Sequence, residues 1–275
     1  MKTRILVSAV MLLIVGGVAY AQAPAPELHG YFDLTYSSKY VWRGFDIYND
    51  KSAVHPGVDL NYGGFGINVT GHRANAGGFE NGERWDYNLY YANGLFMDQS
   101  YALQYRLGWV YYNFPDNSSG LADLQEAHLI LSLPKICPAG VIPSYVLVKL
   151  WPSESGSMVA SKADLSTGLP STGTASGWAH IFMLDYALTT GGLLPETPEQ
   201  VWNFHTEAVF NDGVGPGGQD VDHDWSNVVF GVSTDFDLAE NVVLTPGLYH
   251  QITFDDSVND DKDETWVSVG IKYKF

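Results

Sequence analysis

The stretch TWVSVGIKYKF, residues 265–275, alternates apolar residues with polar or small residues without a break. One face of this segment carries Thr265, Val267, Val269, Ile271, Tyr273 and Phe275, and the other carries Trp266, Ser268, Gly270, Lys272 and Lys274. Successive side chains of a β-strand point to opposite sides. The period of two therefore predicts a strand with one apolar face and one polar or small face.

The same period recurs along the chain, whereas no helical period lasts longer than a turn or two between His29 and Phe275. Gly, Asn, Asp and Pro clusters separate the alternating segments, as expected for turns and loops. The pattern predicts an all-β chain of about twelve strands, at 29–41, 54–62, 65–72, 84–92, 101–112, 121–132, 141–151, 177–188, 201–210, 225–237, 242–252 and 264–275.

The connections between these strands alternate in length. Short ones, such as Gly63-Gly64, alternate with longer polar ones, of which Pro152 to Ser176 is the longest. Short turns at one rim, long loops at the other and an even strand number are typical of an antiparallel up-and-down barrel in a bacterial outer membrane. The stretch from Thr189 to Gln200 is long for the short-turn rim.

Alternation alone does not identify the wet face, because a secreted β-sandwich would bury the same apolar residues. Three features favour a transmembrane barrel. Aromatic residues gather near strand ends, Phe275 ends the last strand, and a closed barrel satisfies every backbone group in lipid. The aromatics expected at the lipid interfaces are Tyr40, Trp42, Trp109, Tyr111, Tyr273 and Phe275. Outer-membrane lipid and the barrel assembly machinery, acting through the last strand, are the expected partners.

The beginning of the sequence predicts export. Lys2 and Arg4 precede an apolar run from Ile5 to Val18, and Ala19-Tyr20-Ala21 offers a cleavage site. We expect a signal peptide at 1–21, a short linker at 22–28 and the barrel at 29–275. The alternative, an uncleaved anchor, would require a longer apolar run.

Composition excludes several functions. The formal net charge of −17 argues against nucleic acid as a partner, since phosphate binding needs clustered cations. The single Cys137 cannot form an internal disulfide or a cysteine-based metal site. The chain has no G-x-S-x-G and no H-E-x-x-H motif, so we expect no enzyme activity and no cofactor.

The inward face of the barrel should carry ionisable side chains. The candidates for lining and selectivity are Asp33, Lys39, Arg43, Asp86, Arg106, Glu126, His128, His205, Glu207, Asp235 and Lys272, and Lys149 has the same predicted phase. They could line a cation-favouring path for small solutes, or they could pair with one another and fill a closed interior. Two same-face pairs, Glu126 with His128 and His205 with Glu207, fit a hydrogen-bond network better than a metal site.

Two loops are strongly acidic. One runs from Asp255 to Glu264 and the other from Asp220 to Asp224. Oxygen ligands at this density could hold Ca²⁺ or Mg²⁺, but a solvated surface loop is the simpler interpretation, and no metal is assigned.

The segment Ser38-Lys39-Tyr40-Val41-Trp42-Arg43-Gly44 resembles the S-x-Y-x-[FW]-R-G signature of the TorF family of porin-like proteins. The match extends over about residues 29 to 92, including Gly30-Tyr31-Phe32-Asp33-Leu34 and His55-Pro56-Gly57-Val58-Asp59. The resemblance implies an outer-membrane barrel with a channel role and names no substrate. The sequence departs from the family after Gly44, where Phe45-Asp46-Ile47-Tyr48 replaces a small polar run, so the role of the first loop stays open.

In strand phase, Tyr40 and Trp42 would face lipid, and Arg43 would face the lumen, where it could hold a carboxylate or form a rim ion pair. The sequence as a whole predicts a channel for passive diffusion of small solutes. The alternative is a closed structural or surface-interaction barrel that acts through its long loops.

Overall fold

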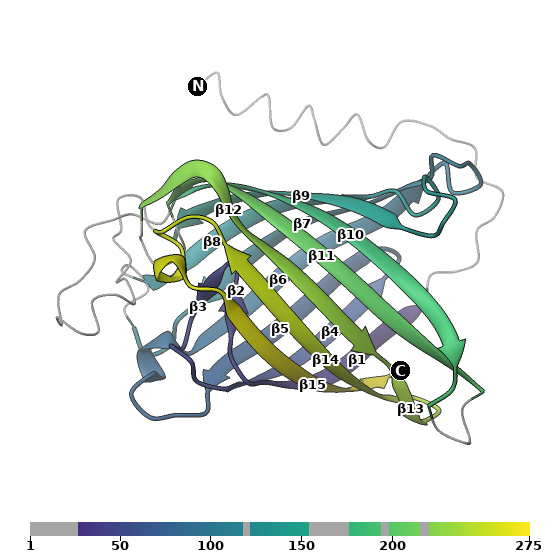
Figure 1. Ribbon diagram of the computed structural model, residues 1–275, viewed down its shortest axis with the longest axis horizontal. Coiled ribbons are helices and arrows are strands. Elements are labelled where there is room, and N and C mark those ends of the chain that lie inside the picture. The colour runs from purple at the N-terminus through teal and green to yellow at the C-terminus, as the bar shows by residue number, and fades with distance from the viewer. Residues whose placement is uncertain (1–26, 118–121, 154–175, 194–197, 215–219) are drawn as a thin grey trace.

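The chain forms one closed antiparallel barrel of twelve strands in the computed structural model, which describes residues 27–117, 122–153, 176–193, 198–214 and 220–275 (Figure 1). The predicted all-β barrel and its strand number are confirmed. The predicted signal peptide and nearly all of the Pro152 to Ser176 loop lie outside the described residues. Within these residues, no helix has the length and apolar character needed to cross a membrane.

The twelve barrel strands are β1 (Leu28–Ser37), β4 (Ala53–Tyr62), β5 (Phe65–Ala74), β6 (Arg84–Leu95), β7 (Leu103–Asn113), β8 (Leu124–Ser132), β9 (Ile142–Pro152), β10 (Gly177–Gly191), β11 (Glu199–Val214), β12 (Asp220–Thr234), β14 (Val242–Thr253) and β15 (Glu264–Lys274). Three shorter strands are β2 (Val41–Trp42), β3 (Phe45–Asp46) and β13 (Phe236–Ala239), and the 3-10 turns are η1 (Glu80–Gly82) and η3 (Asn259–Asp261).

The barrel closes through the pairing of its first and last strands and through the pairs that β14 forms. β15 pairs with β1, where Ile271 lies opposite Leu34, and β14 pairs with both β15 and β12. Each of the twelve long strands in the described residues is therefore paired on both sides, as a closed barrel in lipid requires. β13 continues the line of β12 after a break at Asp235 and also pairs with β14.

The two ends of the barrel differ. Gly63 and Gly64, with φ of 60° and 90°, form the tight turn between β4 and β5 at the end where β1 begins and β15 finishes. We call this the turn end and the opposite one the loop end. Figure 1 places the turn end at the right, near the C-terminus, and β2, β3 and η3 at the left.

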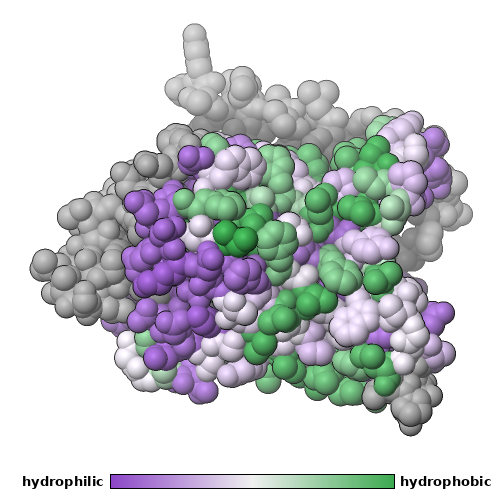
Figure 2. Space-filling model, in the orientation of Figure 1, coloured by the Kyte–Doolittle hydropathy of each residue, from purple (hydrophilic) through white to green (hydrophobic). Residues whose placement is uncertain are grey.

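The outer surface of the barrel is apolar. Val267, Val269 and Ile271 are about 45% exposed on one side of β15, while Ser268 and Gly270 point inward. Figure 2 shows hydrophobic residues over the middle and right of the visible face and hydrophilic residues gathered at the loop end. The alternation predicted for residues 265–275 is confirmed, and the outer face has the apolar character of a surface suited to lipid.

An arginine on this outer face should destabilise the barrel. We expect Val269→Arg, near the middle of β15, to lower the free energy of unfolding by about 2–4 kcal/mol. Thr265→Arg, on the same face but beside the loop end, should cost about 0–1 kcal/mol because its charge can reach the interface. Guanidinium unfolding in lipid vesicles would measure both. Equal losses would mean that this face does not cross the hydrocarbon core.

The lumen as candidate functional site

A hairpin from the first loop turns into the lumen at the loop end. β1 ends at Ser37, and β2 and β3 then form a two-stranded sheet of their own. Arg43 and Gly44, at the tip, have φ of 50° and 92°. Positive φ at both central positions is the mark of a type I′ turn, the tightest hairpin connection. This Arg43-Gly44 turn lets the chain reverse direction inside the barrel, and Figure 1 draws β2 and β3 within its outline.

On one side the hairpin is bound to β7 and β8. The guanidinium of Arg43 forms an ion pair with Glu126, whose Oε2 also accepts a hydrogen bond of 2.6 Å from the Tyr112 hydroxyl. The Glu126 side chain is only 4% exposed. Burial alone would lower the pKa of Arg43, but the Glu126 carboxylate more than offsets it and holds the pKa above its ordinary value. Arg43 therefore stays charged. We call its buried ion pair with Glu126, which holds the hairpin against β8, the latch.

On the other side the same hairpin contacts β12 and β14. The Gln251 amide donates a hydrogen bond of 2.8 Å to the carbonyl of Gly44. A Cβ at Gly44 would lie 2.7 Å from Oδ1 of Asn227, so only glycine fits this approach. Phe45 packs on Val258 in the loop before β15. The hairpin therefore contacts both sides of the barrel and crosses the lumen.

The base of the hairpin is anchored by its own loop. Ile47 donates a backbone hydrogen bond of 2.8 Å to Tyr40, which brings the two ends of the hairpin together. The Tyr48 hydroxyl donates to the carbonyls of His72, at 2.8 Å, and Gly82, at 2.9 Å. These contacts fix the loop against β5 and η1.

Lys39 ties the first loop to β15. Its ammonium lies 2.6 Å from Asp50 and 2.5 Å from Glu264. Burial alone would lower the pKa of Lys39, but hydrogen bonds to these two carboxylates raise it overall. The carboxylates of Asp46, Asp50 and Glu264 lie within 4.8 Å of one another, and the lysine already supplies a cation to this group.

Tyr40 and Trp42 do not face lipid, which corrects the expectation from strand phase. Tyr40 is 9% exposed and its hydroxyl accepts a hydrogen bond of 2.7 Å from Arg84. Trp42 lies in the hairpin with the guanidinium of Arg84 at 4.0 Å and that of Arg43 at 4.8 Å from its ring. The chain leaves the barrel sheet after Ser37, three residues earlier than Tyr40, so the phase of the first strand no longer applies.

Beneath Tyr40 a chain of hydrogen bonds joins four barrel strands, β1, β4, β5 and β6. Ser37 Oγ lies 2.8 Å from His55 Nε2, His55 Nδ1 lies 2.8 Å from His72 Nδ1, and His72 Nε2 lies 3.1 Å from Asp86. The His72 ring stacks on Tyr40 at 4.7 Å. Of these, only Asp86 is a predicted lumen residue. The sequence did not indicate a role for His55 or His72, because each is far in sequence from the residues that it contacts.

The remaining candidates are distributed along the lumen. Those on inward strand positions are Asp33, Arg106, Glu126, His128, His205, Glu207 and Lys272. Asp235 is exposed at the turn end, where it accepts a hydrogen bond of 2.5 Å from Thr245. The predicted pairs form, with His128 at 3.3 Å from Glu126 and His205 at 3.8 Å from Glu207. Asp185 also binds His205, at 2.7 Å.

Lys149 lies on the outer face instead, with its ammonium 5.2 Å from the Trp178 ring. Five inward residues of β9 to β11 are apolar and form a buried cluster, namely Val146, Val148, Ala179, Ile181 and Val209. The sequence IPSYVLVKLW of β9 is apolar in both phases, so its inward face could not be predicted from alternation.

Glycines form niches for large lumen side chains. A Cβ at Gly66 would lie 2.0 Å from Cζ of Tyr90, and one at Gly108 would lie 2.2 Å from His128 Nε2. These rings therefore lie flat along the wall, directly over a glycine on the neighbouring strand. The niches preserve space along the axis of the barrel.

Filling one niche should narrow the lumen. In Gly66→Ala the Tyr90 ring has to leave the wall and lose its 2.8 Å hydrogen bond to Asp59. We expect a lower single-channel conductance and a loss of about 1–3 kcal/mol in unfolding free energy. Gly191→Ala is the matched control, because nothing lies within 4 Å of its Cβ position. Equal conductance in the two variants would contradict the role of the niche.

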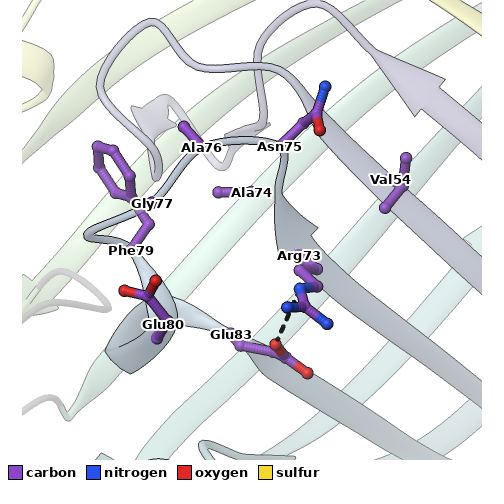
Figure 3. Close-up of a pocket in the computed structure, with 9 residues that line it drawn as sticks. All are labelled: Val54, Arg73, Ala74, Asn75, Ala76, Gly77, Phe79, Glu80 and Glu83. Atoms are coloured by element: carbon purple, nitrogen blue, oxygen red, sulfur yellow. Dashed lines mark ion pairs between the residues drawn. The ribbon is translucent and has the colours of Figure 1, made fainter.

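A cleft of about 520 Å³ also opens at the loop end of β4 and β5 (Figure 3). The loop 75–83 encloses it, and an ion pair of 3.5 Å between Arg73 and Glu83 crosses its edge. Neither residue was a sequence candidate, and the Arg73 side chain is 70% exposed.

Comparison with solved structures identifies porins of similar fold. The chain is similar to the NanC porin, with a TM-score of 0.54 at 10% identity over 89% of this chain and 100% of that one. It is similar to the KdgM porin, with a TM-score of 0.50 at 10% identity over 89% and 99% of the two chains. No family model and no curated protein sequence matches, so the TorF resemblance rests on the residues quoted above. At such low identity, the likeness establishes a shared barrel fold.

Proposed function

We propose that the protein is an outer-membrane channel through which small solutes diffuse passively, with a preference for cations. The observation that carries this proposal is a closed twelve-strand, porin-like barrel whose wall keeps polar side chains in the lumen. Twelve strands about 4.8 Å apart enclose a backbone radius of roughly 12 Å, which suits small solutes. Such transport needs neither a catalytic residue nor a cofactor.

The accessible charges of the lumen support a preference for cations. Asp185 and Glu207 have side chains that are 42% and 25% exposed. The side chains of Arg43 and Arg84, by contrast, are 14% and 4% exposed, and each guanidinium is paired with a carboxylate. Of these four charged residues, a mobile ion therefore reaches the two acidic ones more readily than the two basic ones.

We also propose a route to the membrane. Residues 1–21 are removed after export, residues 22–28 form a short linker before the barrel, and the barrel assembly machinery inserts the chain through β15. Within the lumen, the selectivity candidates are Asp33, Lys39, Arg43, Asp86, Arg106, Glu126, His128, His205, Glu207, Asp235 and Lys272.

Single-channel recording of the refolded protein in a planar bilayer tests the proposal. Steady openings with a reversal potential that favours cations in a salt gradient are the expected result. Openings that favour anions would keep the channel and overturn the selectivity. Absence of conductance, from protein shown independently to be folded and inserted, would overturn the channel and favour a barrel that acts through its loops.

A further inference from the structure

A row of directly paired residues runs along the inner wall of the barrel over five neighbouring strands. Asp185 pairs with His205, His205 with Gly231, Gly231 with Tyr249, and Tyr249 with Trp266. Each pair joins neighbouring strands, so the row runs from β10 through β11, β12 and β14 to β15. We call these five residues the ledge. All of them occupy inward positions, in register with one another.

Tyr249 forms a flat platform in this row. A Cβ at Gly231 would lie 2.6 Å from Cδ1 of its ring, and one at Gly247 would lie 2.8 Å from Cε2. The ring therefore lies across both glycines with one face against the wall. Trp266 stacks beside it at 5.4 Å and 13° between planes.

The platform differs from the other inward tyrosines of the described residues. Tyr90 has the guanidinium of Arg106 over its ring at 3.6 Å, and Tyr31 has the ammonium of Lys272 at 4.5 Å. In the part of the chain that the structure describes, neither Tyr249 nor Trp266 has such a cation. No lysine or arginine of the described residues therefore competes with a mobile cation for this aromatic pair.

The other end of the ledge is acidic. His205 lies between Asp185, at 2.7 Å, and Glu207, at 3.8 Å. Among the described residues, neither carboxylate pairs with a lysine or an arginine. Even with His205 protonated, the group carries one excess negative charge. These side chains are also more exposed than Glu126 at the latch.

We infer that the ledge is a binding site for small organic cations, such as alkylammonium groups, on the path through the lumen. The aromatic pair on β14 and β15 attracts the cation through its π-electrons, and Asp185 and Glu207 on β10 and β11 add negative charge further along the same wall. The site rests on the proposed channel and gives it a substrate class. A neutral sugar would also stack on an aromatic ring, but it would gain nothing from the excess negative charge.

Binding of tetramethylammonium tests the site without requiring conduction. It can be measured by titration calorimetry on the folded protein in a polyoxyethylene detergent, which carries neither a cation nor a sugar. Sodium at the same ionic strength and glucose are the reference ligands. We expect tetramethylammonium to bind, and Tyr249→Leu to weaken that binding about tenfold. Asp185→Asn should weaken it as well.

Tyr90→Leu is the matched control, since it removes a tyrosine that also lies on a glycine but is already covered by Arg106. The affinity of Tyr90→Leu for tetramethylammonium should stay within about twofold of that of the unmodified protein. Equal losses in the two tyrosine variants, binding of glucose alone, or no binding of tetramethylammonium would each overturn the ledge.

Bilayer recording separates this inference from the channel itself. Block of the current by tetramethylammonium, relieved in Tyr249→Leu, supports both. Binding without any conductance would leave the ledge and remove the channel, whereas conductance indifferent to tetramethylammonium would leave the channel and remove the ledge.

Discussion

Glu126→Ala is expected to lower the free energy of unfolding by about 3–5 kcal/mol, because it leaves the buried guanidinium of Arg43 without its counter-charge. The same change removes the acceptor for the Tyr112 hydroxyl. Guanidinium unfolding in lipid vesicles, followed by tryptophan fluorescence, measures the loss. A rise in single-channel conductance should accompany it, since the hairpin loses its latch.

Two further variants test whether the loss of stability in Glu126→Ala comes from breaking the buried ion pair. Arg43→Met combined with Glu126→Leu should recover most of the stability, because no charge is then left buried and unpaired. Glu83→Ala breaks the exposed pair with Arg73 and should cost no more than about 1 kcal/mol. If Glu126→Ala costs no more than Glu83→Ala, Arg43 is not held by a buried ion pair.

Removing the hairpin should have the largest effect on conduction. Tyr40 and Ile47 are joined by a 2.8 Å hydrogen bond, so a Gly-Gly link can replace Val41 to Asp46 without moving the base of the loop. The deletion removes a segment that contacts both β8 and β14 across the lumen. We expect the single-channel conductance to rise roughly twofold or more.

The deletion is interpretable only if the barrel still folds, which heat-modifiable migration on a detergent gel and far-ultraviolet dichroism establish. Arg43→Ala, which keeps the hairpin but loses the latch, should give an intermediate conductance. An unchanged conductance in a folded deletion variant would show that ions do not pass the hairpin.

The barrel could be predicted from alternation because lipid and lumen impose opposite demands on successive residues. Residues 265–275 show this in full, and their register with β1 follows from closure. The loop end could not be predicted in the same way. Tyr40 and Trp42 have the composition of an interfacial girdle, and only the Arg43-Gly44 turn and the apolar Phe45 that follows it hinted at a buried loop.

Contacts between distant residues were the least predictable part of the lumen. Arg43 and Glu126 were both candidates, yet nothing in the sequence paired residues 83 positions apart. The histidine chain from Ser37 to Asp86 depends on the register of β1, β4, β5 and β6, which a single sequence does not specify. The apolar inner face of β9 could not be predicted, because both faces of this strand are apolar.

The partners of the hairpin also set an order of events in folding. Its tip needs Glu126 from the middle of the chain, Gln251 and Val258 near the end, and the base needs Glu264. Contacts of such long range in sequence form late, because a long loop must close first. The hairpin therefore lacks some of its contacts until the last two strands have formed. Its final packing in the lumen marks the completion of the barrel. A chain halted before β14 would leave Phe45 without Val258 and Lys39 without Glu264, which distinguishes an unfinished barrel from a finished one.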